Sequence, residues 1–118
     1  MTTEFVSIRE RATVDEAIDA LKHFEGTREA LATIYLYDET YRITGAVPLV
    51  KIAVSPATTL LADLREEAVT CAADTPDDEV AGLFDKYNLV TLGVIDRDHR
   101  LAGIITADDV ITMLRHTK

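Results

Sequence analysis

The sequence carries one pattern twice, at a fixed interval, and this repeat limits the folds that the chain can adopt. Matching positions lie 58 residues apart and include Asp38 with Asp96, Arg42 with Arg100, Ile43 with Leu101, and Gly45 with Gly103. Upstream, the apolar helix pattern that starts at Val14 superposes on the one that starts at Pro76, after a shift of a few residues in the connection. Neither unit can bury its own sheet alone, so the two units must pack against each other.

Each unit predicts the order strand, helix, strand, strand, helix. In the first repeat, residues 1–54, we expect strands at 5–8, 33–37 and 43–47 and a short helix or turn at 49–53, with 29–32 left ambiguous. In the second repeat, residues 65–118, we expect strands at 69–71, 91–95 and 101–105 and a final helix at 107–115. Residues 55–64 are predicted to be the linker, with one possible helical turn. The predicted fold class is α+β, with two pseudo-symmetric β-α-β-β-α repeats packed sheet to sheet.

Three local signals set the expected ends of the internal helices. Thr13 and Glu16 form a capping box that starts the first helix, and Gly26 suits a left-handed stop after it. In the second repeat, Thr75 is predicted to cap the helix, with Pro76 at the first helical position, where its missing N–H costs nothing.

Composition narrows the functions that the chain can perform. The 118 residues suffice for one domain, and no apolar run is long enough to span a bilayer. Because residues 1–10 mix charged with apolar residues, we expect no signal peptide. A net charge of −9, from 21 acidic and 12 basic residues, argues against a nucleic-acid partner. The acidic excess leaves two interpretations, plain solubility or an affinity for divalent cations. The lone Cys71 has no disulfide partner and fits a reducing, cytoplasmic setting.

A hydroxyl and a carboxylate meet at the corner between the last strand and the last helix. Thr106 is the expected N-cap, and Asp109 follows three residues later in an imperfect capping box, because aspartate is one carbon shorter than glutamate. The positive end of a helix suits a phosphate, and an ionised carboxylate can accept from both hydroxyls of a ribose. The alternative is that both residues only cap the helix.

Five strings of the sequence resemble tandem cystathionine-β-synthase (CBS) domains, the Bateman module, and in particular the cytoplasmic CBS pair of MgtE-type magnesium transporters. The strings are TIYLYD at 33–38, SPATTLLADL at 55–64, EVAGLFDKY at 79–87, LGVID at 92–96 and RLAGIITADDV at 100–110. The resemblance implies a regulatory module that binds an adenine nucleotide, ATP or AMP, in the cleft between the sheets and has no catalysis of its own.

The resemblance also implies which residues hold the nucleotide. The family signature places Thr106 against phosphate or ribose and Asp109 against the ribose hydroxyls. The full implied set is Val69, Thr70, Cys71, Thr91, Leu92, Gly93, Ile105, Thr106 and Asp109. In the first repeat, Pro48 replaces the hydroxyl and Lys51 replaces the aspartate, so we expect at most one nucleotide per chain.

The MgtE resemblance further implies a homodimer in which Mg²⁺ ions lie between carboxylates of neighbouring domains. It also implies a second partner, the transmembrane domain of a Mg²⁺ transporter, and a location at the cytoplasmic face of the inner membrane. The implied metal ligands are Asp96, Asp98 and Asp108, and the alternative for each is a turn or cap residue. Because the histidines show no ligand spacing and no serine or cysteine has an obvious base partner, we expect no enzyme. Two other functions stay open, a stand-alone adenine-nucleotide sensor and a purely structural dimerisation module.

Overall fold

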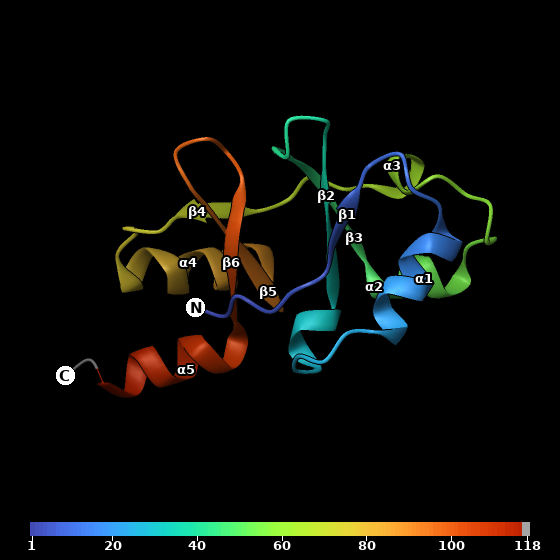
Figure 1. Cartoon of the computed structure of the whole chain (residues 1–118). Coiled ribbons are helices and arrows are strands. Elements are labelled where there is room, and N and C mark those ends of the chain that lie inside the picture. The colour runs from blue at the N-terminus through green and yellow to red at the C-terminus, as the bar shows by residue number, and fades with distance from the viewer. Residues whose placement is uncertain (117–118) are drawn as a thin grey trace.

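The computed structural model describes residues 1–116 and shows two three-stranded sheets, one from each repeat (Figure 1). The first sheet has the order β1 (Ser7–Arg9), β2 (Thr33–Tyr37), β3 (Ile43–Pro48), and the second has the order β4 (Thr70–Ala72), β5 (Thr91–Ile95), β6 (Leu101–Thr106). In both sheets the first pair of strands is parallel and the second pair is antiparallel. The predicted α+β fold of two repeats is therefore confirmed.

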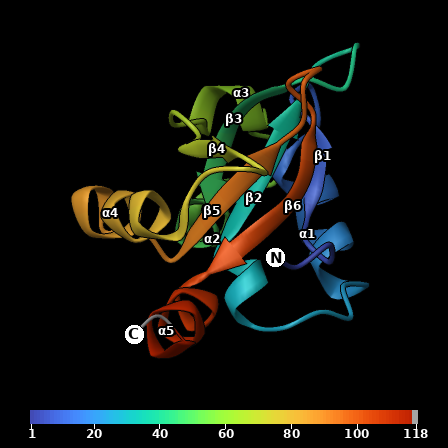
Figure 2. The same ribbon diagram turned by 90° about the vertical axis from the view of Figure 1, so that its left-hand side faces the viewer.

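The helices flank the sheets on both sides (Figures 1 and 2). They are α1 (Val14–Lys22), the 3-10 turn η1 (Glu29–Leu31), α2 (Leu49–Val54), α3 (Leu61–Leu64), α4 (Asp77–Tyr87) and α5 (Ala107–His116). In Figure 1, α1, α2 and α3 lie on one side of the strands, and α4 and α5 lie on the other. Residues 117 and 118 of the predicted second repeat lie outside the described residues.

The interval of 58 residues recurs in the backbone geometry. Both antiparallel pairs have a register irregularity at the matching step, between Leu36 and Tyr37 and between Val94 and Ile95. Positive φ values recur at Tyr41 (66°) and His99 (63°), also 58 residues apart. The first repeat holds η1 in its connection to β2, which accounts for the predicted shift.

Two predicted helix ends differ in the structure. The carbonyl of Pro76 accepts from the amide of Val80 at 3.0 Å, so Pro76 is the N-cap itself and the prediction that Thr75 caps the helix was wrong. The first helix ends at Lys22, and no described glycine has a positive φ, so Gly26 does not form the expected left-handed stop. The predicted N-cap at Thr13 is confirmed, because its hydroxyl accepts from the amide of Glu16 at 3.3 Å, while the Glu16 carboxylate lies 3.5 Å from that hydroxyl.

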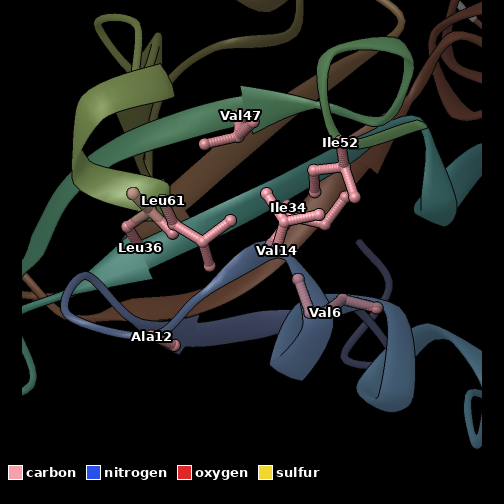
Figure 3. Close-up of a cluster of buried hydrophobic side chains, with 9 residues drawn as sticks. Val6, Ala12, Val14, Ile34, Leu36, Val47, Ile52 and Leu61 are labelled. Atoms are coloured by element: carbon pink, nitrogen blue, oxygen red, sulfur yellow. The ribbon is translucent and has the colours of Figure 1, made fainter. Parts of the chain in front are cut away.

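Three apolar clusters hold the fold together. One fills the space between the first sheet and its helices (Figure 3), and a second does the same for the second sheet. The third lies between the sheets and includes Tyr35 and Ile104. Leu61, from the segment predicted as a linker, is fully buried in the first cluster together with Leu36, so this part of the connection belongs to the core.

Each repeat lends a short extended segment to the sheet of the other. Thr2 pairs with Ile104 of β6 through two backbone hydrogen bonds of 2.7 and 2.8 Å. In the same way, Glu66 pairs with Ala46 of β3 through bonds of 2.7 and 3.0 Å. We call this arrangement the reciprocal crossing. Each bridge covers one position on the outer edge of β3 or β6, which a three-stranded sheet would otherwise leave open there.

One buried hydrogen bond links side chains of the two sheets. The hydroxyl of Tyr35 lies 3.0 Å from the hydroxyl of Thr91. Replacing Tyr35 by phenylalanine keeps the ring but leaves the Thr91 hydroxyl, on a residue only 5% exposed, without this partner. We expect Tyr35→Phe to lower the free energy of unfolding by about 1–2 kcal/mol, measured by urea denaturation.

The same variant should change the alkaline limit of stability. Burial raises the pKa of the Tyr35 phenol above 10.0, and the bond to Thr91 offsets only part of that rise. As pH rises through 10, the unfolded chain therefore loses this proton before the folded chain does, and the free energy of unfolding falls. In Tyr35→Phe the fall above pH 10 should be smaller. An unchanged alkaline profile would contradict the assignment to Tyr35.

Candidate functional site

The corner between β6 and α5 forms a complete capping box. The amide of Thr106 donates to Oδ2 of Asp109 at 3.0 Å, and the amide of Asp109 donates to the Thr106 hydroxyl at 3.4 Å. The expectation of an imperfect box was wrong, because the aspartate reaches the backbone. Oδ1 of Asp109 and the hydroxyl proton of Thr106 have no partner among residues 1–116. The corner therefore caps the helix and still offers one acceptor and one donor.

Eight of the nine residues implied for the nucleotide lie on or next to the strands of the second sheet and divide between its two faces, whereas Asp109 lies in the first turn of α5. Thr70 pairs with Gly93 and Thr91 pairs with Thr106, and Thr91 contacts the first sheet through Tyr35. The side chains on the opposite, helix-facing side belong to the second apolar cluster: Val69, Cys71, Leu92 and Ile105. Leu92 is fully buried there. Cys71 is also buried in this cluster, whereas Val69 and Ile105 are only partly buried against it.

The side chain of Tyr35, from the first sheet, packs against the backbone at Gly93 of β5. A Cβ at that glycine would lie 3.3 Å from Cε1 of Tyr35 and 3.0 Å from Cδ1 of Leu101. The first repeat thus supplies the bulk that the second repeat lacks at this position. The assignment of Gly93 to the nucleotide remains a prediction.

A cavity of about 190 Å³ brings together three of the implied residues, Cys71, Ile105 and Asp109. It lies beside the first turn of α4, and Thr75 and Asp77 also line it. Burial raises the pKa of the Cys71 thiol, which disfavours the thiolate that nucleophilic chemistry requires. The lining of this cavity thus combines apolar side chains with two carboxylates, those of Asp77 and Asp109.

The corresponding corner of the first repeat is differently equipped. Pro48 is the N-cap of α2 and makes no side-chain capping bond. The ammonium group of Lys51 lies 2.6 Å from a carboxylate oxygen of Glu66, in the reciprocal crossing. Lys51 therefore already has an anionic partner, whereas its counterpart Asp109 accepts from the backbone at the start of its own helix.

The carboxylates proposed as metal ligands have roles in turns and helix starts. Oδ1 of Asp96 accepts from the amides of Asp98 and Arg100 at 2.9 and 3.0 Å. Its counterpart Asp38 makes the same kind of turn. Asp108 lies in the first turn of α5, where a negative charge suits the helix dipole. Within residues 1–116, no three His, Cys, Asp or Glu side chains come together as a metal site.

A larger cleft, of about 310 Å³, lies near the tips of the two β-hairpins, and we call it the tip cleft. Its lining residues come from both repeats: Phe5, Ser7, Tyr35, Leu36, Tyr37, Tyr41, Ile43, Arg100 and Leu101. None of these nine residues was assigned to a site from the sequence. The recurrence of aromatic residues around one hairpin was the available signal.

Comparison with known proteins gives a consistent result. Residues 61–116 match the family model of the CBS domain. The magnesium transporter MgtE of Thermus thermophilus is 36% identical over 115 residues, which cover 97% of this chain and 26% of the transporter. The chain thus spans about a quarter of the length of the curated relatives it matches.

Solved structures extend the similarity to the fold. One similar structure is the crystal structure of the cytosolic domain of the Mg²⁺ channel MgtE in complex with ATP. Its sequence is 34% identical to this chain, its fold superposes with a TM-score of 0.85, and the match covers 96% of this chain and 46% of that one. The soluble part of a magnesium transporter is 30% identical, with a TM-score of 0.86, over 96% of this chain and 44% of that one. Among the described residues, no helix is both long enough and apolar enough to cross a membrane.

These similarities agree with the internal repeat and the two sheets. Residues 61–116 form a CBS domain, and the chain as a whole has the fold of a CBS-domain pair related to the cytosolic region of MgtE magnesium transporters.

Proposed function

We propose that the chain is a regulatory, ligand-sensing CBS pair of an MgtE-type magnesium transporter, which acts at the cytoplasmic side of the membrane and has no catalytic role. The observation that carries this proposal is the similarity to MgtE along 97% of the chain. The corner at Thr106 and Asp109 supports it, because both side chains keep unpartnered polar atoms.

The proposed ligand of this corner is an adenine nucleotide. Oδ1 of Asp109 would accept from the ribose hydroxyls, and the Thr106 hydroxyl would donate to a phosphate or to the ribose. Helix α5 is ten residues long, and the partial positive charge at its N-terminal end favours a phosphate there. Support by analogy comes from the ATP complex of the related MgtE cytosolic domain.

The charge of the chain favours particular forms of the ligand. A triphosphate approaching a chain of net charge −9 is repelled unless a cation accompanies it. ATP should therefore bind as its Mg²⁺ complex, and AMP should bind with less dependence on metal. The corresponding corner of the first repeat, with Pro48 and Lys51, should bind no nucleotide, because Lys51 is already paired with Glu66.

The proposed response to Mg²⁺ follows from the acidic surface. Carboxylates on neighbouring domains repel each other when Mg²⁺ is scarce and are bridged when it is abundant. Asp96, Asp98 and Asp108 remain the proposed ligands, shared with a second subunit or with another domain of a transporter. Exposed apolar residues on α2, Val50 (67%) and Val54 (78%), are compatible with a homodimer.

Calorimetric titration with ATP, AMP and Mg²⁺ tests the proposal. We expect Thr106→Ala and Asp109→Ala to weaken nucleotide binding by about 10- to 100-fold, because each removes a polar contact to the ligand. Lys51→Ala is the matched control from the first repeat and should leave the affinity unchanged. Circular dichroism of each variant checks that the loss of a helix cap has not unfolded the chain.

Three outcomes separate the candidate functions. Nucleotide binding together with Mg²⁺-dependent dimerisation, followed by sedimentation of the 13.0 kDa chain, supports the transporter module. Nucleotide binding that Mg²⁺ does not affect indicates a stand-alone nucleotide sensor. A dimer that binds neither ligand indicates a structural module, and unchanged affinity in Asp109→Ala would refute the assigned corner.

A further inference from the structure

We propose that the tip cleft is a second binding site, separate from the nucleotide corner, and that it takes a planar aromatic molecule carrying a single anionic group. The two sites lie at opposite ends of β6, because Leu101 at its start lines the tip cleft and Thr106 at its end forms the corner. Figure 1 shows the same separation, with both hairpins extending away from α5. A volume of about 310 Å³ is at the lower end of the range for small-molecule sites.

The walls of the tip cleft are suited to a flat ring. The rings of Tyr37 and Tyr41 stack with their centroids 5.3 Å apart and an interplanar angle of 25°. Tyr41 is 63% exposed, which leaves ring surface open to a ligand. Ile43 and Leu101 supply aliphatic surface on the two repeats. Aromatic and aliphatic surfaces of this kind stack a planar ring and bury it from water.

The charge of the tip cleft is opposite to that of the chain. Its lining contains one arginine, Arg100, and no carboxylate, although the net charge of the chain is −9. Nε of Arg100 donates to the carbonyl of Thr40 at 3.2 Å, and this bond fixes the guanidinium across the two hairpins. No described carboxylate forms an ion pair with Arg100. The remaining N–H groups of Arg100 are therefore available to an anion.

The repeat supplies a natural control for this arginine. Arg42 is the counterpart of Arg100, 58 residues earlier, and it does not line the tip cleft. The second repeat also has Gly93, Ile95 and His99 at the positions of the three tyrosines. The aromatic and cationic groups thus occur together at only one of the two related places, which a merely structural consequence of the repeat would not produce.

The experiment uses two fluorescent compounds that differ only in one anionic sulfonate group, 1-anilinonaphthalene-8-sulfonate and the uncharged N-phenyl-1-naphthylamine. Titration of the intact chain should show binding of the sulfonate, weakened about tenfold or more in Arg100→Ala and unchanged in Arg42→Ala. The uncharged compound should bind the chain and both variants alike. Amide shifts in NMR spectra should centre on Ile43 and Leu101 rather than on Asp109.

Asp109→Ala should leave sulfonate binding unchanged, so failure of this inference and failure of the proposed nucleotide site are distinguishable. Equal weakening in Arg42→Ala and Arg100→Ala would show a general charge effect and overturn the proposal. Amide shifts confined to the exposed apolar residues of α2 would overturn it as well. Loss of secondary structure in Arg100→Ala is checked by circular dichroism, and Arg100→Lys, which keeps the charge but not the planar fork, provides a milder second variant.

Discussion

Leu61→Ala is expected to lower the free energy of unfolding by about 2–5 kcal/mol, the range for removing a fully buried leucine side chain. Leu61 is 0% exposed and packs in the first apolar cluster with Ile34 and Leu36. Its amide also donates to the carbonyl of Ala12 at 2.9 Å, so the backbone around the new cavity is held in place and can relax only partly. Urea denaturation followed by circular dichroism measures the change.

The neighbouring residue provides the control for this prediction. Leu60 is 44% exposed, and Leu60→Ala should change the free energy of unfolding by no more than about 0.5 kcal/mol. Similar losses in both variants would mean that Leu61 is not the buried residue of the pair. A small loss in Leu61→Ala alone would mean that residues 61–64 act as a loose connection.

Gly103→Ala should destabilise the chain by about 2–4 kcal/mol, because the reciprocal crossing passes directly over this glycine. A Cβ there would lie 2.8 Å from the carbonyl oxygen of Thr2 and 2.7 Å from the side chain of Met1. The side chain of Met1 can move aside, whereas the carbonyl of Thr2 can move only with the backbone. We expect both hydrogen bonds between Thr2 and Ile104 to break, seen as faster amide exchange at Ile104.

Gly82→Ala is the matched control, because it makes the same chemical change in an open place. No atom lies within 4 Å of a Cβ built at Gly82, on the exposed side of α4. Alanine favours a helix over glycine, so this variant should be more stable by about 0.5–1 kcal/mol. If Gly82→Ala and Gly103→Ala both destabilised the chain, the loss would not come from a specific contact at Gly103.

The interval between matching residues predicted most of the topology. Once Asp38 corresponds to Asp96, the two hairpins must share turn geometry, and the positive φ values of Tyr41 and His99 agree with this. The corner at Thr106 was also predictable, because a capping box depends on residues only three apart. Local and repeated patterns can be read directly from a sequence.

Features that depend on packing between distant segments were not predictable. Leu61 lies in a stretch whose serine, proline and threonines indicate a linker, and only the position of the first sheet buries it. The tip cleft requires Arg100 to cross to the other hairpin, which no local pattern indicates. The error at Pro76 has a local cause, because proline has a similar φ as an N-cap and as the first helical residue.

The reciprocal crossing has a consequence for cooperativity. Each repeat contains the three strands of its own sheet, but Thr2 of the first repeat pairs with the edge of the second sheet and Glu66 of the second repeat pairs with the edge of the first. Opening one repeat removes this edge residue from the other sheet and exposes to water the backbone groups that it paired. We therefore expect the two halves to unfold together, so that a ligand that holds one of them also stabilises the other.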